Sequence, residues 1–185
     1  MRTHTFTVLL DREPTEEEHD RLYEAGLDDA SVESENGTGL LHVDREGLTL
    51  DDAILSVLQD LRVAGFRATG LQQDDLVSLK TIAQRAGRSY EGVRLLATGK
   101  RGPGGFPPPL SGDGWSLYSW ALVSAWFREH YQAGDEVDDY SRTVAVADLM
   151  ARAQLIAHSG RRRIDVESLA AGFASFEAET GAHNA

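Results

Sequence analysis

The chain of 185 residues contains no cysteine, which excludes a disulfide framework, a thiolate metal site and a cysteine nucleophile. Aromatic residues make up only 8%, and no apolar run approaches the roughly 20 residues that a membrane-spanning helix requires. The polar start, Met1 to His4, is unlike a signal peptide. The remaining composition, 41% hydrophobic and 26% charged, is typical of a globular protein. We therefore expect a cytoplasmic protein without membrane contact.

Motifs that mark enzymes are also missing. The six histidines, at positions 4, 19, 42, 130, 158 and 183, are scattered and show no metal-binding spacing such as H-E-x-x-H. The sequence has no P-loop and no G-x-S-x-G motif. We expect no enzymatic activity, no catalytic residues, no metal and no cofactor; a carboxylate pair assembled only in the fold is the one enzymatic alternative left open.

Acidic residues outnumber basic ones, and the formal net charge is −12 at pH 7. The imbalance is uneven: residues 1–73 hold 6 Lys/Arg and 16 Asp/Glu, whereas residues 74–131 hold 7 and 5. Within residues 78–101, six basic residues accompany one acidic residue, Glu91. A local basic stripe attracts the phosphate charge of duplex DNA, while acidic flanks weaken non-specific binding. The charge pattern predicts that an anionic partner binds the middle of the chain.

Residues 1–73 alternate strand and helix patterns and predict an acidic domain of their own. The first expected elements are a strand from His4 to Leu10 and a helix capped by Thr15 and ended by Gly26. A hairpin of residues 30–35 and 38–44 is expected around the turn Asn36-Gly37. A second helix would begin at Thr49 or Asp51 and end at Gly65, and a last strand would run from Phe66 to Leu71. This β-α-β-β-α-β order is that of the ferredoxin-like split βαβ arrangement. The fold class predicted for the chain is α+β.

Residues 134–185 follow an acidic stretch and predict a pair of C-terminal helices. Ser141 is expected to cap the first helix, which would run to His158, and Asp165 is expected to cap the second. We interpret the basic run Arg161–Arg163 between them as a solvated loop, with a phosphate contact as the alternative. The second helix would place three apolar residues on one side: Leu169, Phe173 and Phe176.

Residues 79–96 carry the pattern of a helix-turn-helix inside a central domain, residues 74–133. Two helices that cross closely need a small residue where they touch, and Ala83 supplies it. The turn needs a residue that tolerates positive φ, and Gly87 stands four positions later. An ordinary helical hairpin would share part of this pattern, and Arg88 departs from it because an apolar residue is more common there. The side chains expected to face a common core are Ile82, Ala86, Val93 and Leu96.

The segment after the second helix predicts a β-hairpin wing. The tract from Lys100 to Pro109 is rich in Gly and Pro, carries two cations, and leads to an apolar strand expected from Trp115 to Tyr118. Such a wing would lie beside the second helix with its backbone close to phosphates. Ser119 would cap a third helix. Four of its residues are expected in the core: Trp120, Val123, Trp126 and Phe127.

The segments IAQRAGRS, GKRGPGGFPPP and W-x5-W resemble the winged helix-turn-helix of small bacterial DNA-binding regulators, the excisionase and MerR-like group most of all. The upstream stretch, with DDASVE and HVDREGLTLDDAILSVLQDLRVAGF, resembles the leading domain that accompanies this helix-turn-helix in uncharacterised bacterial proteins. The resemblance covers roughly residues 4–131 and leaves the C-terminal segment unmatched. It implies binding to double-stranded DNA and implies no particular operator.

In a helix-turn-helix the second helix enters the major groove, where its exposed side chains meet base edges. Arg94 is the strongest candidate for base reading because its guanidinium matches the O6 and N7 acceptors of guanine; a plain phosphate contact is equally compatible. The predicted base-reading residues are Tyr90, Glu91, Arg94 and Thr98. The predicted phosphate contacts are Ser78, Lys80, Arg88, Ser89, Lys100 and Arg101.

The predicted function is that of a nucleoid-associated, repressor-like transcriptional regulator. A single module of this size usually buries too little surface for tight specific binding, so we expect a homodimer that uses either the sheet or the Ala-rich C-terminal helices. The alternative is an adaptor, antitoxin or phage-defence component whose acidic first domain binds a partner protein. RNA binding is rejected because the central strands offer only Phe6 and His42 for stacking, within an acidic domain.

Overall fold

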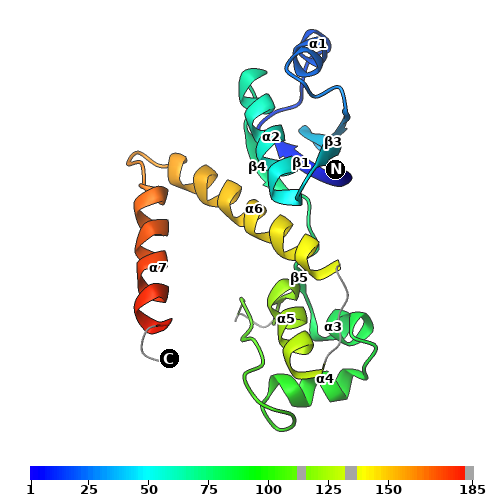
Figure 1. The fold of residues 1–185 in the computed structure, drawn as a ribbon, viewed down its shortest axis with the longest axis vertical. Helices are drawn as coiled ribbons and strands as arrows, with labels where there is room; N and C mark the ends of the chain where they lie inside the picture. Colours follow the sequence, from blue (N-terminus) through cyan, green and yellow to red (C-terminus); the bar gives the residue numbers. More distant parts are fainter. Residues whose placement is uncertain (112–115, 132–136, 182–185) are drawn as a thin grey trace.

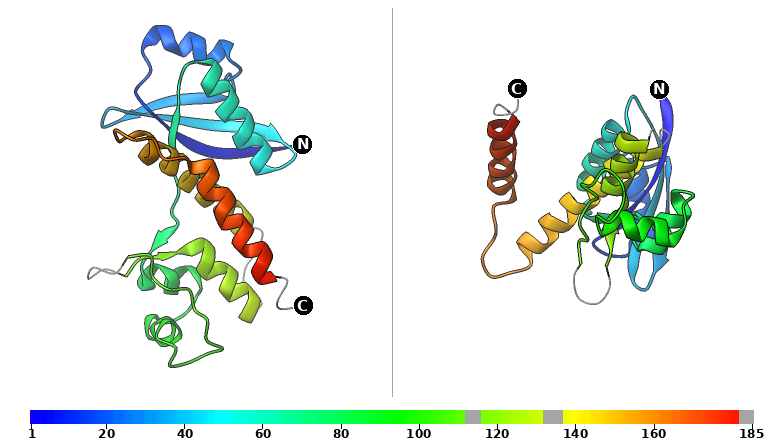
Figure 2. Two further views of the ribbon diagram at one scale, coloured as in Figure 1. Left: turned by 90° about the vertical axis from the view of Figure 1, so that its left-hand side faces the viewer. Right: turned by 90° about the horizontal axis from the view of Figure 1, so that it is seen from below.

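The computed structural model describes residues 1–111, 116–131 and 137–181 and shows a mixed α+β protein (Figure 1). A four-stranded antiparallel sheet with two helices lies at one end, and a smaller helical unit lies at the other. A long helix, α6 (Val137–His158), runs between the two ends, and the last helix, α7 (Val166–Gly181), leaves the far end of α6 (Figures 1 and 2).

The sheet unit follows the element order expected from the sequence. Its elements are β1 (Arg2–Leu10), α1 (Glu16–Glu24), β2 (Ala30–Glu35), β3 (Thr38–Gly47), α2 (Leu50–Val63) and β4 (Ala68–Leu71). The strands lie in the order β2-β3-β1-β4, each antiparallel to its neighbour. Alternate residues of β1, including Phe6 and Val8, are buried against Leu22 of α1 and Val57 of α2, because side chains of a strand alternate between its two faces.

Local signals fix most boundaries in this unit. Asn36 and Gly37 both have positive φ, 52° and 79°, as a two-residue hairpin turn requires, and the predicted hairpin is confirmed. The predicted cap Thr15 is part of a capping box at the start of α1, in which the Glu18 carboxylate accepts from the Thr15 N–H at 3.1 Å. Thr49 caps α2 by accepting from the Asp52 N–H. The last strand is shorter than predicted and begins at Ala68 rather than at Phe66, which is buried in the core.

The helical unit has a core of its own. Its elements are β5 (Leu76–Val77), α3 (Leu79–Arg85), α4 (Tyr90–Ala97), β6 (Tyr118–Ser119) and α5 (Trp120–Tyr131). The four side chains expected to face a common core do so: Ile82, Val93 and Leu96 are buried, and Ala86 is partly buried against them. Ser119 caps α5 as predicted, because its Oγ accepts from the Leu122 N–H at 3.3 Å. The expected core residues of α5 pack here too: Val123, Trp126 and Phe127, with Trp120 partly buried.

The predicted β-hairpin wing is not present as a pair of strands among the described residues, although the Leu110 N–H donates to the Leu117 carbonyl at 2.7 Å. No strand occurs among the described residues between α4 and β6, and β6 pairs with β5 instead. Trp115, where the strand was expected to begin, lies outside the described residues. Pro107–Pro109 lack backbone N–H groups and cannot donate to a strand ladder. Phe106 packs against Trp126 with ring centroids 5.0 Å apart, so the tract is an irregular loop held to the core.

The two predicted C-terminal helices are present as α6 and α7, and α6 packs mainly on the sheet unit. α6 begins at Val137, four residues before the predicted cap Ser141, which lies inside the helix. α6 packs along β4, where the Asp148 carboxylate accepts from the Leu71 N–H at 2.9 Å, and Val144 joins the core of the sheet unit. These partners are distant in the sequence, so local periodicity cannot reveal them.

Candidate nucleic-acid interface

Two serines set the ends of the helices in the candidate interface. The Ser78 Oγ accepts from the Thr81 N–H at the start of α3, and the Ser89 Oγ accepts from the Gly92 N–H at the start of α4. Both are predicted phosphate contacts, and both have a capping role in the structure. Between the helices Gly87 has a φ of +60°, which lets the chain turn sharply. The turn places α4 across α3 with one face of α4 buried and the other exposed.

The outer face of α4 carries all four predicted base-reading residues. Tyr90 is 53% exposed, and Glu91 and Thr98 are also exposed. The Arg94 side chain is 40% exposed and donates two hydrogen bonds to Glu91, from Nε to Oε2 at 2.8 Å and from Nη2 to Oε1 at 2.6 Å. The Thr98 hydroxyl donates to the Arg94 carbonyl at 2.8 Å. Arg94 therefore lies on the outer face, with its guanidinium held by Glu91.

The Glu91–Arg94 pair shifts the pKa of both groups. The hydrogen bonds from Arg94 lower the pKa of Glu91, and the charges of Arg94 and Lys100 lower it further. The same bonds raise the pKa of Arg94. Because Glu91 stays ionised, it cancels much of the field of Arg94 in the absence of a ligand, and any anion that binds Arg94 competes with Glu91.

The predicted phosphate-contacting cations fall into two groups. Lys80, Lys100 and Arg101 are exposed. Lys100 and Arg101 follow α4 directly and donate their backbone N–H groups to the Leu95 carbonyl, so they stay close to its C-terminal end. Arg88 lies with its guanidinium carbon 4.2 Å from the ring centroid of Tyr131, a cation–π contact that ties it to α5. Arg88 thus has a structural partner, whereas no hydrogen bond or ion pair within the described residues involves the side chains of Lys100 and Arg101.

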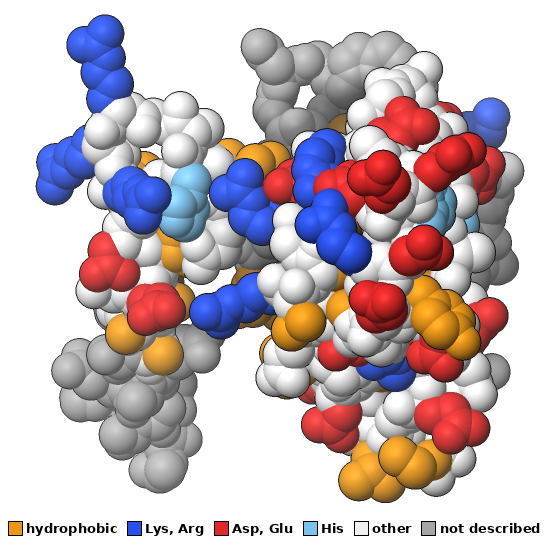
Figure 3. Space-filling view, turned by 90° about the horizontal axis from the view of Figure 1, so that it is seen from above, with side chains coloured by type: hydrophobic (Ala, Val, Ile, Leu, Met, Phe, Trp, Pro, Cys, Tyr) orange, Lys and Arg blue, Asp and Glu red, His pale blue; other side chains and the backbone are white. Residues whose placement is uncertain are grey.

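The position of α4 separates this cationic face from the acidic unit. α4 lies at the end of the molecule opposite to the sheet, and no other described helix or strand covers its outer side (Figure 1). Seen from the sheet end, Asp and Glu side chains are spread over the surface of the sheet unit (Figure 3). The exposed face of α4 and the acidic surface of the sheet unit therefore lie at opposite ends of the molecule, and the sheet unit does not cover Arg94 or Lys100 (Figure 1).

The residue that attaches α5 to the helix pair, Asp75, was not predicted from the sequence. Asp75 is 9% exposed, and its Oδ1 accepts from the Ala121 N–H at 2.6 Å while its carbonyl accepts from the Trp120 N–H. No role was predicted for Asp75 from the sequence. The bonds from Asp75 to the start of α5 join residues 45 positions apart, so the sequence around Asp75 does not indicate them. The one local indication of a buried role is that Asp75 directly precedes an apolar strand.

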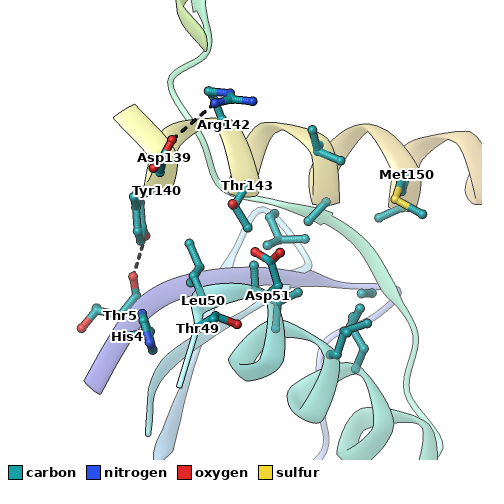
Figure 4. A pocket seen from close by; sticks show the side chains of 18 of the residues that line it. His4, Thr5, Thr49, Leu50, Asp51, Asp139, Tyr140, Arg142, Thr143 and Met150 are labelled. Atoms are coloured by element: carbon teal, nitrogen blue, oxygen red, sulfur yellow. Dashed lines mark hydrogen bonds and ion pairs between the residues drawn. The ribbon is translucent and has the colours of Figure 1, made fainter. Parts of the chain in front are cut away.

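A second feature is a groove of 1490 Å³ between α6, α2 and the start of β1 (Figure 4). Apolar side chains such as Leu55 and Val146 line it. Tyr140 of α6 donates its hydroxyl to the Thr5 carbonyl at 2.5 Å, and burial raises the pKa of Tyr140. His4, 6% exposed, lies beside this contact, and its Nε2 has no hydrogen-bond partner in the described part of the chain. The groove exists because α6 docks on the sheet unit, which the sequence could not predict.

Comparisons with known proteins give no relative: no family model, curated protein or solved structure matches the chain. Within residues 1–111, 116–131 and 137–181, no group of three or more His, Cys, Asp or Glu side chains is placed to hold a metal ion. None of the helices in these ranges combines the length and the apolar character needed to cross a membrane.

Proposed function

We propose that residues 74–131 bind double-stranded DNA in the manner of a winged helix-turn-helix, with α4 as the recognition helix, and that the protein regulates transcription as a homodimer. The observation that carries the proposal is the exposed outer face of α4 at the end of the molecule farthest from the acidic sheet unit. That face offers Tyr90, Arg94 and Thr98, with Lys100 and Arg101 at its edge. An exposed helix with cations beside it suits the major groove.

The irregular loop after α4 takes the place of the wing in this proposal. The Trp126 Nε1 donates to the Gly104 carbonyl at 2.9 Å and Phe106 packs in the core, so the loop has a defined position beside α4. Lys100 and Arg101 at its start would contact phosphates and fix the register of α4. The sheet unit, with its β2-β3-β1-β4 order, would be a ferredoxin-like domain that repels DNA and so limits binding to α4 and its loop.

Sequence-specific DNA binding is tested first with a pool of random duplexes. We expect the full chain to enrich a two-fold symmetric sequence whose half-sites lie about 34 Å apart, as two copies of one recognition helix require. We expect Arg94→Ala to weaken binding to the enriched site by roughly 5- to 100-fold while binding to unrelated duplexes changes little.

Arg161→Ala serves as the matched control, because it removes the same charge from an exposed loop far from α4. Equal losses for Arg94→Ala on every duplex would make Arg94 a phosphate contact. A pool from which nothing is enriched would contradict sequence-specific binding.

The second candidate is an adaptor whose acidic sheet unit binds a basic partner protein. The observation in its favour is the spread of acidic side chains over the sheet end (Figure 3). On this proposal, replacing the exposed Glu16, Glu17 and Glu24 by Gln in the full chain abolishes partner binding and leaves DNA binding unchanged. Partner binding that survives these substitutions would contradict a role for α1.

A further inference from the structure

Among the described residues, the last helix, α7, has few contacts with other helices or strands, and those are mainly with α6. Leu169 and Phe173 lie one turn apart on one side of α7 and are 54% and 76% exposed. An aromatic side chain this exposed, beside a second apolar residue, is typical of a surface that another molecule covers. Figures 1 and 2 show α7 extending away from the end of α6.

The turn before α7 has a defined geometry that directs the helix away from α2. The Ser159 N–H donates to the Ile156 carbonyl at 3.1 Å, and the Ile164 N–H donates to the Ala157 carbonyl at 3.3 Å. The Asp165 carboxylate then caps α7 as predicted, accepting from the Ser168 N–H at 3.0 Å. Because these bonds fix both ends of the turn, α7 descends on the side of α6 opposite to α2 (Figure 1).

The groove described above lies on the other side of α6, between α6 and α2 (Figure 4). Its lining includes the exposed apolar side chains Leu55, Val146 and Met150. Along α6 the lining runs from Asp139 to Gln154, which corresponds to roughly 22 Å of helix. α7 has 16 residues, roughly 24 Å. The groove therefore matches α7 in length and in apolar character.

The charges of the groove and of α7 are also complementary. The lining of the groove contains four arginines and two aspartates, a net positive set. The α7 segment contains three glutamates and no Lys or Arg. A helix of acidic composition would thus meet a groove of opposite charge, which favours the pairing of these two surfaces over contact between two copies of either one.

We propose that α7 of a second copy lies in the groove between α2 and α6, and that the exchange is reciprocal. The turn at residues 159–165 points α7 away from its own groove, whereas a two-fold axis brings each α7 to the groove of the other copy. The exchange would bury Phe173 and Leu169 against Leu55 and Met150. The exchange of α7 would provide the dimer surface that the proposed binding to two half-sites requires. Its experimental test does not involve DNA.

The chain has no cysteine, so engineered disulfides give a direct test. Two differently tagged full-length chains are prepared, one with Phe173→Cys and one with Leu55→Cys, then mixed and oxidised. We expect a disulfide-linked heterodimer in the mixture and little of either homodimer. A single chain that carries both substitutions shows whether the groove holds its own α7 or the α7 of a second copy. If the exchange occurs, this chain should form disulfide-linked dimers in dilute solution. An intrachain disulfide in a monomer would show that α7 occupies its own groove and would overturn the exchange.

Light scattering on the unlinked proteins gives an independent readout. We expect the unmodified chain to be a dimer and the double variant Leu169→Asp with Phe173→Asp to be a monomer. The helical circular dichroism of the double variant should be unchanged, because both side chains are already exposed in the single chain. Ala174→Asp adds charge to the same helix about 100° from Phe173 and should leave the dimer intact. A dimer that survives the double substitution would overturn this proposal and leave the homodimer of the proposed function in place. An unmodified chain that is monomeric would overturn both the exchange and that homodimer, whereas duplex binding by α4 is measured separately.

Discussion

Arg94 and Glu91, three positions apart, form an exposed ion pair on the outer face of α4. Both were predicted from the sequence to be base-reading residues on the exposed side of the second helix. The structure gives the geometry: two hydrogen bonds join Glu91 to the guanidinium expected to reach a base. Because such an exposed pair is weak and screened by salt, a phosphate or a base edge can displace Glu91 at moderate cost.

The pair predicts a gain of function for Glu91→Gln. Removing the carboxylate charge frees Arg94 and also removes repulsion between Glu91 and phosphate, so we expect duplex DNA to bind about 2- to 5-fold more tightly at low salt. The pKa of Glu91 is lowered, so the pair persists above that pKa and is lost only as the pH falls through it; around neutral pH the gain should not depend on pH.

Fluorescence anisotropy with a labelled duplex measures this effect. Glu24→Gln, an identical charge change at the sheet end, is the control for net charge and should have little influence. Weaker binding by Glu91→Gln would mean that Glu91 itself contacts DNA, as an acceptor from cytosine would.

At the scale of elements, signals within a few residues of a boundary could be read from the sequence. The Asn36-Gly37 turn and the caps Thr15, Ser89 and Asp165 all depend on neighbouring backbone groups, and the structure has each of them. The start of α6 was missed because Ser141 looks like a cap although the helix already begins at Val137. A capping residue predicts a boundary only where the preceding residues do not continue the helix.

The docking of α6 on β4 depends on a close approach at Gly70. A Cβ at this position would lie 2.7 Å from the Asp148 Oδ1 and 3.0 Å from the Leu9 Cδ1. Gly70→Ala should therefore push α6 away from the sheet and lower the free energy of unfolding by about 1–3 kcal/mol, as overpacking does.

Thermal and urea denaturation measure this loss, with Gly172→Ala as the matched control. Gly172 lies within α7, and an added Cβ there meets no heavy atom within 4 Å, so higher helix propensity should stabilise that helix slightly. If Gly70→Ala were as stable as the unmodified chain, α6 would not pack on β4 as described.

At the scale of the whole molecule, the sequence predicted the separation of charge but not the shape that produces it. Counting charges showed an acidic first segment and a basic middle. The structure adds that α4 and the sheet unit lie at opposite ends, so the negative charge of the sheet unit stays away from α4 (Figure 1). The groove could not be predicted, because it follows from contacts between residues more than 70 positions apart, such as Leu71 with Asp148.

The central claim is that α4 and the cations at its end contact DNA, and the salt dependence of duplex binding tests it most directly. Each phosphate contact releases counterions, so the logarithm of the binding constant falls with the logarithm of the salt concentration in proportion to the number of contacts. Lys100→Ala with Arg101→Ala should weaken binding to every duplex and reduce the magnitude of that slope by about 2 per chain. Arg161→Ala with Arg162→Ala should leave the slope unchanged. A slope that stays the same for Lys100→Ala with Arg101→Ala, or no duplex binding by the unmodified chain at low salt, would contradict the account.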